Sequence, residues 1–348
     1  MRIWNRLEGC IQNVGEGNRP ARIAVLGAGA LGTALSMCIA RNRYNVKLWV
    51  RRQRLCNQIL KLRENPEYCP GVKLPRSIHP TKRLEECLDG AGIIFFAVPS
   101  FAIRDVARKT AKLLNGGAIV LSTAKGVEYP PFKRMSEVLA AELPYATIAV
   151  MSGPNFATEL LRGSPSVTVL ASEETRSLNL VRQMVGSDSL AVRISDDVVG
   201  VETGGIMKGI LTIAIGVAYG MGFGDNTMGL LFGQGFREMS DICRYLGGKM
   251  ETIGGESGLG DWVASAFSQK SRNRALGQML GMGLRSQVAS KVAKEGVVAE
   301  GTKSVAAIHD LANEGKIRVP LTDFVYRILF NNEWPTNSFV QLLEQLKH

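Results

Sequence analysis

Residues 22–52 read RIAVLGAGALGTALSMCIARNRYNVKLWVRR, and this stretch decides the fold of the first half of the chain. Apolar residues 23–26 predict a short buried strand, residues 33–43 predict a helix, and residues 46–50 predict a second strand. Gly27, Gly29 and Gly32 stand between the first strand and the helix. A strand, a glycine turn, a helix and a strand within about 30 residues form the βαβ context that a dinucleotide-binding fingerprint needs.

Each glycine of this turn has a physical role. Gly27 permits the tight turn out of the strand, Gly29 lets the backbone approach a pyrophosphate, and Gly32 lets the helix lie close to the sheet. The backbone N–H groups around Ala30 and Leu31 then face the phosphates, whose negative charge the helix dipole favours. These five residues are therefore predicted to bind a dinucleotide; the alternative is a turn that only packs a helix on a strand.

The composition describes a soluble globular protein. The 348 residues are enough for two domains, with 45% hydrophobic and 21% charged residues. The longest apolar run, residues 210–224, is too short and too rich in glycine to predict a membrane span. Residues 1–21 lack the apolar core of a secretory signal and predict an N-terminal extension. The six cysteines form no CxxC pair and no metal spacing, which predicts free thiols in a reducing cytoplasm and no bound metal.

The formal net charge is +11, from 42 Lys and Arg against 31 Asp and Glu. Such a charge suits either a nucleic-acid binder or an enzyme whose positive field steers anionic ligands to its site. The basic residues are spread along the chain, with small groups at 51–54 and 270–274, and no long basic run interleaved with aromatic residues occurs. We therefore expect an anionic small molecule and no nucleic acid as partner, although a basic solvated surface would give the same charge.

The first half of the chain alternates between predicted strands and helices. After a helix at 53–63, a loop at 64–80 and a short helix at 81–88, strands are predicted at 93–98, 118–122, 148–151, 167–170 and 191–194. Helices separate these strands, which predicts a doubly wound, Rossmann-type parallel sheet over residues 22–195. No convincing strand follows, so residues 196–348 predict an all-α domain that carries the substrate.

Ligands of an open α/β sheet bind beyond the carboxyl ends of its strands. Pro99-Ser100, Lys125-Gly126 and Gly153-Pro154-Asn155 follow predicted strands and are therefore expected at that edge. Oxidation of an alcohol also needs a base for the hydroxyl proton. The three histidines are poorly placed for this role, whereas Lys208 stands in an uncharged stretch, where it either reaches the surface or is buried as a general base.

Other candidates have equally plain structural alternatives. Lys125 is either a solvated loop residue or a ligand contact. Asp261, after Gly258-Leu259-Gly260, could be a helix N-cap. Ser271-Arg272-Asn273 combines a hydroxyl, a guanidinium and an amide that suit a phosphate or a diol, but the surface of a helix would hold them too.

Seven motifs occur in an order that resembles the soluble NAD(P)-dependent glycerol-3-phosphate dehydrogenase family. They are GAGALGTALS at 27–36, AKG at 124–126, SGPNFATE at 152–159, GVETGGIMKGIL at 200–211, GLGD at 258–261, SRNR at 271–274 and VAEG at 298–301. The resemblance covers nearly the whole chain from about residue 22.

The resemblance implies reversible reduction of dihydroxyacetone phosphate to sn-glycerol 3-phosphate by NAD(P)H, in glycerophospholipid metabolism, by a cytoplasmic homodimer. It makes Lys208 the proton donor or acceptor and places Lys125 against both cofactor and substrate. The implied substrate contacts are Gly153, Asn155, Asp261, Ser271, Arg272 and Asn273. The implied further cofactor contacts are Ala157, Arg272, Val298 and Glu300.

The chain departs from the family pattern near these residues. Gly209 replaces the asparagine that usually follows the lysine, Met228 and Gln234 replace two arginines, and Ser265-Ala266 replaces Thr-Cys. An altered pocket leaves two alternatives open: a related dehydrogenase acting on a different hydroxy or keto substrate, or a cofactor-binding protein with reduced activity.

The cofactor preference is predicted from the end of the second strand. A site that selects NAD commonly carries Asp or Glu there, because the carboxylate binds the ribose 2′-hydroxyl. This strand instead ends in Arg51-Arg52, with no acid before Glu64. These guanidinium groups can pair with a 2′-phosphate, so NADPH is expected to bind at least as tightly as NADH; the alternative is a solvated basic turn.

Overall fold

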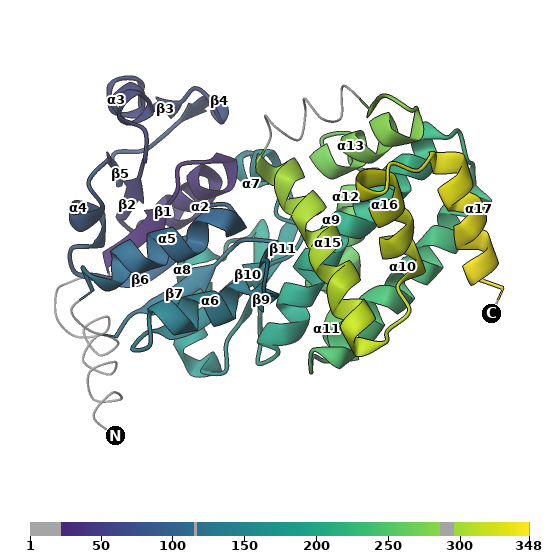
Figure 1. The fold of residues 1–348 in the computed structure, drawn as a ribbon. Coiled ribbons are helices and arrows are strands. Elements are labelled where there is room, and N and C mark those ends of the chain that lie inside the picture. Colours follow the sequence, from purple (N-terminus) through teal and green to yellow (C-terminus); the bar gives the residue numbers. More distant parts are fainter. Residues whose placement is uncertain (1–21, 115–116, 286–295, 348) are drawn as a thin grey trace. The chain divides into compact units, whose positions relative to one another are not determined.

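The computed structural model describes residues 22–114, 117–285 and 296–347, with side chains in the last segment described from Glu300 on. The described chain divides into two units (Figure 1). The first comprises residues 22–98, 102–124 and 135–198, and the second residues 99–101, 125–134 and 199–347. The predicted extension at 1–21 lies outside the described residues.

The first unit is built on an eight-stranded sheet. Its spatial order is β12 (Leu190–Ser195), β11 (Ser166–Ala171), β10 (Thr147–Ser152), β7 (Ile119–Ser122), β6 (Ala91–Phe96), β1 (Arg22–Leu26), β2 (Val46–Trp49) and β5 (Ile78–Thr81). All neighbouring strands run parallel except β10 and β11, which are antiparallel. The predicted Rossmann-type parallel sheet is confirmed, with one antiparallel pair that the sequence did not indicate.

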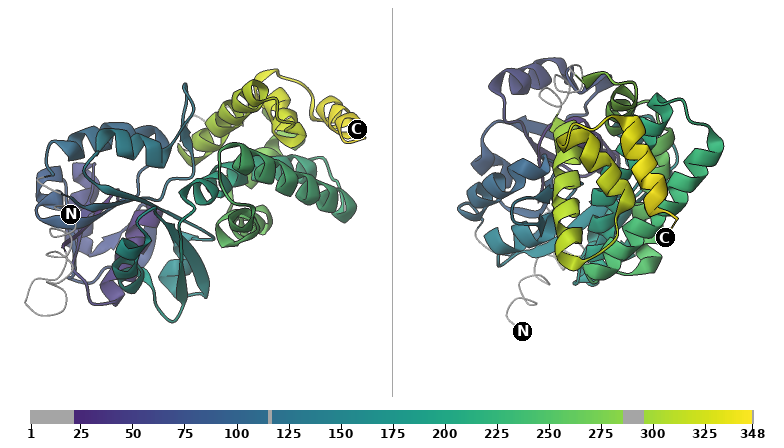
Figure 2. Two further views of the ribbon diagram at one scale, coloured as in Figure 1. Left: turned by 90° about the horizontal axis from the view of Figure 1, so that it is seen from below. Right: turned by 45° about the vertical axis from the view of Figure 1, so that its right-hand side comes forward.

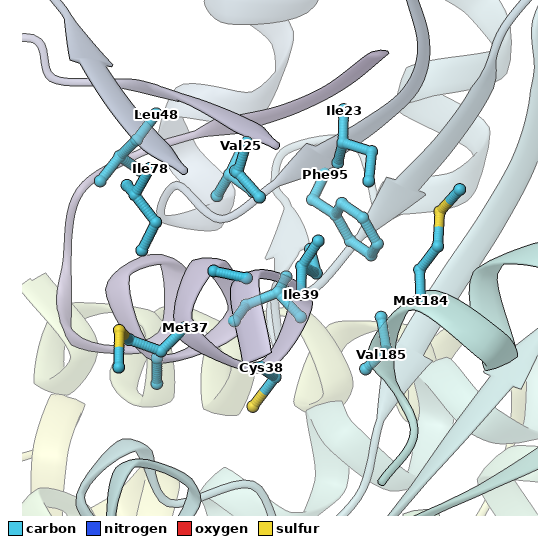
Figure 3. Packing of buried hydrophobic residues seen from close by; sticks show 14 of the residues in the cluster. Ile23, Val25, Met37, Cys38, Ile39, Leu48, Ile78, Phe95, Met184 and Val185 are labelled. Carbon is cyan, nitrogen blue, oxygen red and sulfur yellow. The ribbon is translucent and has the colours of Figure 1, made fainter. Parts of the chain in front are cut away.

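Helices lie on both faces of the sheet (Figure 2). They are α2 (Ala30–Arg41), α3 (Gln53–Leu62), α4 (Leu84–Leu88), α5 (Ser100–Ala111), α6 (Met135–Glu142), α7 (Ala157–Arg162), the 3₁₀ turn Thr175–Ser177 and α8 (Leu178–Val185). Helix α2 packs closely because Ile39 faces Ile23, Val25 and Phe95 of the sheet, and all four side chains are at most 1% exposed (Figure 3). Burial on both faces explains why the central strands are uniformly apolar.

The predicted loop at 64–80 contains strands. Strands β3 (Glu64–Asn65) and β4 (Cys69–Lys73) form a small antiparallel ribbon. Strand β5 lies beside β2 as the edge strand of the main sheet. Pro80 fits β5 because an edge strand leaves one side of its backbone without ladder partners. This edge brings the residues after β5 next to the residues after β2.

The second unit is mainly helical. Its helices are α9 (Val198–Gly220), α10 (Asp225–Tyr245), α11 (Met250–Gly254), the π-helical turn Glu256–Gly260, α12 (Asp261–Phe267), α13 (Arg272–Gly281), α15 (Gly296–Gly315), α16 (Pro320–Phe330) and α17 (Pro335–Gln345). It also contains a ribbon of β8 (Val127–Glu128) and β9 (Lys133–Arg134). Helix α9 is long and apolar enough to cross a membrane by length and composition, but 83% of its apolar window is buried, as in a core helix.

Candidate active site

Three charged side chains meet in the second unit around Asp261. The Asp261 carboxylate is 2% exposed, with Lys125 Nζ 2.5 Å from Oδ2 and Lys208 Nζ 3.3 Å from Oδ1. Lys208 Nζ also donates a hydrogen bond to Ser265 Oγ at 2.9 Å. Each oxygen of the buried carboxylate therefore faces a cation, and the Ser265 hydroxyl helps fix one of them.

These side chains come from separate parts of the chain. Lys208 lies in the middle of α9, whereas Asp261 opens α12 directly after the π-helical turn. Lys125 follows β7 in the segment that precedes β8. The alternative that Asp261 acts as an N-cap is wrong, because Gly260 holds that position and the carboxylate binds two lysines instead.

Among the charged residues around Asp261, Lys125 has a shifted pKa. Burial is the main cause, and together with the positive charge of Lys208 it lowers the pKa of Lys125 to about 8, although Asp261 acts in the opposite direction. Its side chain is 21% exposed and that of Lys208 is 17% exposed. Neither lysine is a freely solvated surface residue. This argues against a solvated loop position for Lys125 and against a surface position for Lys208.

Glu300 adds a carboxylate that interacts electrostatically with Lys208. Its side chain, on α15, accepts the backbone N–H of Ser100. Burial raises the pKa of Glu300, while Ser100, Arg272 and Lys208 favour the charged form. Glu300 thus interacts electrostatically with two other predicted contact residues of the second unit, Arg272 and Lys208.

The SRN motif opens helix α13. Ser271 is its N-cap and accepts the Arg274 N–H at 3.3 Å, while Arg272 is exposed at the first helical position. Asn273 Oδ1 is buried and has no hydrogen-bond partner among the described residues. A buried amide oxygen in this state is suited to a donor from a bound molecule.

Gly209 and Gly301 both lie close to the Asn273 amide. A Cβ at 209 would lie 3.3 Å from Asn273 Nδ2, and a Cβ at 301 would lie 2.8 Å from Asn273 Oδ1. A larger side chain at 209 would therefore press on Asn273. Gly209 is thus a departure that changes the surroundings of a predicted substrate residue, and Ser265 is another, beside Lys208.

The glycine turn of the first unit fits a pyrophosphate. Gly27 has φ +119°, and a Cβ there would lie 2.5 Å from the Ala97 carbonyl oxygen; a Cβ at 32 would lie 1.9 Å from the Gly27 oxygen. A Cβ at 29 would meet nothing within 4 Å, and no side chain caps the start of α2. The open backbone above a helix N-terminus, with Ala30 and Leu31 in its first turn, is suited to a phosphate.

Sequence reasoning missed the residue that fixes this turn. Asn65, fully buried in β3, donates from Nδ2 to the Ala28 carbonyl at 2.9 Å and to Thr33 Oγ1 at 2.8 Å. Asn65 lies 37 residues after Ala28 in the sequence, inside the segment predicted to be a loop. The sequence signal that could have found Asn65 is the pattern of the β3–β4 ribbon, which was not recognised.

The remaining predicted residues of the first unit lie at strand and helix ends. Asn155 Nδ2 donates to Thr168 Oγ1 at 2.9 Å, while Asn155 Oδ1 is buried without a partner among the described residues. Gly153 follows β10 with φ +138°, and Ala157 is the first residue of α7. In the second unit, Val298 lies in α15, but its side chain is outside the described part of the structure.

The two arginines after β2 differ. Arg52 pairs with Glu67 and lies 3.3 Å from the Tyr68 hydroxyl, with its guanidinium 5.9 Å from the Tyr68 ring centre. Arg51 is exposed. The pair predicted to contact the cofactor therefore contains one residue that already has an acidic partner.

Comparisons with known proteins agree with these features. Residues 22–178 match the model of the NAD-dependent glycerol-3-phosphate dehydrogenase N-terminus, and residues 197–340 match that of its C-terminus. The chain belongs to the glycerol-3-phosphate dehydrogenase family. The resemblance drawn from the seven motifs is confirmed.

Relatives in this family cover almost the full chain. The glycerol-3-phosphate dehydrogenase [NAD(P)+] of Moorella thermoacetica is 38% identical over 93% of this chain and 96% of its own. That of Clostridium tetani is 36% identical over 89% and 88%. The crystal structure of the Coxiella burnetii glycerol-3-phosphate dehydrogenase is 32% identical, with a TM-score of 0.87 over 93% of this chain and 99% of that one.

Two further departures from the family pattern lie in α10 of the second unit. Met228 is 6% exposed within the main apolar cluster of that unit. Gln234 Nε2 lies 3.4 Å from Glu238 Oε1 one turn along α10. Glu238 is fully buried and accepts the backbone N–H groups of Leu321 and Thr322 and the Thr322 hydroxyl.

Proposed function

We propose that the chain is an NAD(P)-dependent glycerol-3-phosphate dehydrogenase that reduces dihydroxyacetone phosphate to sn-glycerol 3-phosphate and catalyses the reverse reaction. The observation that carries the proposal is the buried Asp261 carboxylate with Lys125 and Lys208 on its two oxygens. This arrangement supplies a positioned proton and a second positive charge, which reduction of a phosphorylated ketone requires. The family membership supports the choice of substrate and cofactor.

Lys208 is the proposed proton donor. As the carbonyl oxygen gains negative charge, the ammonium group donates its proton to form the alcohol. Asp261 stabilises that ammonium, and the hydrogen bond to Ser265 Oγ fixes its direction. In the oxidative direction the neutral amine takes the hydroxyl proton, so one residue serves both directions.

Lys125 and the start of α13 are proposed to bind the substrate. Lys125 adds positive charge beside the reacting group, and the Arg272 guanidinium binds the phosphate in a bidentate manner. Asn273 offers its unpartnered buried amide oxygen to a substrate hydroxyl. Gly153, Asn155 and Ser271 are proposed as further substrate contacts from their match to the family.

The bound nicotinamide supplies the hydride. Gly27, Gly29 and Gly32 are proposed to hold the pyrophosphate, with the N–H groups of Ala30 and Leu31. Other proposed cofactor contacts are Arg51, Arg52, Lys125, Ala157, Arg272, Val298 and Glu300. The basic end of β2 supports a preference for NADPH over NADH.

A second candidate rests on Gly209. A Cβ at 209 would lie 3.3 Å from Asn273 Nδ2, so the glycine permits a position of the Asn273 amide that the usual asparagine would disturb, which favours a related keto substrate. Oxidation of NADPH and NADH should be followed with dihydroxyacetone phosphate and a panel of phosphorylated ketones. Turnover with dihydroxyacetone phosphate supports the first candidate, turnover only with another ketone supports the second, and cofactor binding with no turnover contradicts both.

We also propose a cytoplasmic homodimer. The five described cysteines are free and buried, which supports a reducing compartment. Sedimentation measured across a range of protein concentrations tests the dimer; a mass of one chain throughout would contradict it.

A further inference from the structure

The ribbon of β3 and β4, which is not part of the main sheet, contacts the glycine turn of the first unit. The fully buried Asn65 of β3 donates from Nδ2 both to the Ala28 carbonyl and to Thr33 Oγ1. Ala28 precedes the second glycine of the turn, and Thr33 follows the third. One side-chain amide therefore ties the two ends of the turn together.

The orientation of this amide is fixed by the ribbon itself. Asn65 Oδ1 accepts the backbone N–H of Tyr68 at 3.4 Å, which leaves Nδ2 for the turn. Strands β3 and β4 are joined by Glu64 and Lys73, whose charged groups are 3.3 Å apart. The Glu64 carboxylate also accepts the Gly71 N–H at 2.8 Å. The ribbon is thus a small support, held by its own hydrogen bonds, that presents one amide to the turn.

The hydrogen bond to Ala28 also sets the direction of an N–H group. A trans peptide is planar, so its C=O and N–H groups point in opposite directions. With the Ala28 carbonyl turned toward Asn65, the Gly29 N–H points away from the ribbon, and it has no acceptor among the described residues. The Cys69 thiol of β4 lies 3.8 Å from the Ala30 carbonyl oxygen. The ribbon therefore contacts carbonyl groups of the turn and leaves N–H groups for a phosphate.

These contacts restrict a backbone that would otherwise be flexible. Three glycines in six residues give the turn wide conformational freedom, which a phosphate would have to remove on binding. Ala28 is 8% exposed and Thr33 is fully buried, so water is poorly placed to replace the N–H groups of Asn65. The buried amide therefore holds the turn in one conformation before a cofactor binds.

We propose that Asn65 is a positioning residue for the cofactor, which fixes the N–H groups of the glycine turn for the pyrophosphate without contacting the cofactor itself. This inference rests on the proposed dehydrogenase function and deepens it by assigning part of the cofactor affinity to the β3–β4 ribbon. NADH and NADPH share the pyrophosphate, so Asn65 should contribute equally to the binding of both. The proposed proton transfer uses residues of the second unit and should not depend on Asn65.

The test is a titration of NADPH and NADH with the wild type, Asn65→Asp and Asn65→Ala. Aspartate keeps the shape of the side chain but has no N–H to donate, whereas alanine removes the amide without adding charge. Each variant should weaken the binding of both cofactors by the same factor, ~10-fold. In contrast, kcat with dihydroxyacetone phosphate at saturating NADPH should stay within about threefold of the wild type.

Asn42→Asp is the matched control. Asn42 is the C-cap at the other end of α2, and its Nδ2 donates to the carbonyls of Met184 and Gly186 at 2.8 and 2.7 Å. This change also removes two amide hydrogen bonds from the first unit and adds the same charge. It should lower the melting temperature but leave the Kd of each cofactor within about twofold of the wild type.

Four outcomes overturn the inference. If both Asn65 variants bind the cofactors as tightly as the wild type, the ribbon does not position the turn, while the proposed dehydrogenase stands. An equal loss of affinity in Asn42→Asp would assign the effect to general weakening of the first unit. A loss confined to one cofactor would assign Asn65 to the adenosine end. If the wild type binds neither cofactor, the proposed function fails as well. Melting curves without cofactor identify the folded variants, and Asn65→Ala carries the test should the aspartate variant not fold.

Discussion

Two buried carboxylates in the second unit are used in opposite ways. Asp261 is 2% exposed and lies between the ammonium groups of Lys125 and Lys208. Glu238 is fully buried, and it accepts hydrogen bonds from the N–H groups and hydroxyl at the start of α16 and from the amide of Gln234. A carboxylate paired with ammonium groups can support chemistry, because those groups can give up a proton. A carboxylate that accepts backbone N–H groups mainly holds the start of a helix in place.

The pKa values follow this difference. Burial raises the pKa of Glu238 to about 8, although four hydrogen bonds favour its charged form. Burial lowers the pKa of Lys125 to about 8. The fold therefore contains a buried acid and a buried base that both change charge near pH 8, one in the core and one in the candidate active site.

The largest effect is expected from Asp261→Asn. This change removes the charge that holds both lysines, so kcat should fall ~10³-fold, and the unpaired lysines should also lower the melting temperature. Steady-state kinetics and thermal unfolding of the variant measure both quantities. Glu238→Gln is the matched control at the other carboxylate, and its kcat should stay within about threefold of the wild type. Equal losses of activity in the two variants would contradict the assignment of Asp261 to catalysis and Glu238 to structure.

Arg272→Lys tests the phosphate contact beside the first carboxylate. A lysine keeps the charge but loses the bidentate geometry, so KM for dihydroxyacetone phosphate should rise ~10-fold or more. Kinetics with dihydroxyacetone, which lacks the phosphate, provide the control and should be unaffected. An unchanged KM for the phosphorylated ketone would show that Arg272 does not bind its anion.

The pH dependence of KM should report Lys125. Because its pKa is lowered to about 8, its charge is lost as the pH rises above that value. KM for the phosphorylated substrate should rise up to ~10-fold per pH unit above pH 8 in the wild type. Lys125→Arg keeps its charge at these pH values and should flatten the rise; a profile identical to that of the wild type would assign the pH dependence to another group.

Glu238 should affect stability with little effect on activity. Its pKa is raised from 4.5 to about 8, so the folded state holds a proton that the unfolded state releases. This contribution to the free energy of unfolding is present below pH 4.5 and is lost as the pH rises toward 8, by about 1.4 kcal/mol per pH unit. Urea unfolding at pH 6 and pH 8 should therefore show the wild type losing roughly 2 kcal/mol relative to Glu238→Gln. Parallel pH dependences would contradict the raised pKa.

The strongest local patterns were predicted well. The glycine turn, helix α2 and helix α3 follow from glycine spacing and apolar periodicity within about 30 residues. The antiparallel direction of β11 was not predicted, because a strand buried on both faces has the same apolar pattern in either direction. Strand β5 was missed because its four residues include a proline, which reads as loop unless the strand is known to be an edge.

The site was harder to predict because its contacts are long-range. Asp261 and Lys125 are 136 residues apart, so local reasoning favoured the N-cap alternative for Asp261. Asn65 carries no local signal for its bonds to the glycine turn. Lys208 was found because an isolated lysine in an apolar helix needs an explanation, which is a property of the sequence itself.

The most direct test of the account is the kcat of Lys208→Ala, measured together with the Kd of NADPH. If Lys208 transfers the proton, kcat with dihydroxyacetone phosphate should fall ~10²-fold or more, while the Kd of NADPH stays within about twofold. Lys208→Arg, which keeps the charge but donates its proton poorly, should be similarly inactive. A Lys208→Ala variant with near-normal kcat would contradict the assignment of proton transfer to this residue.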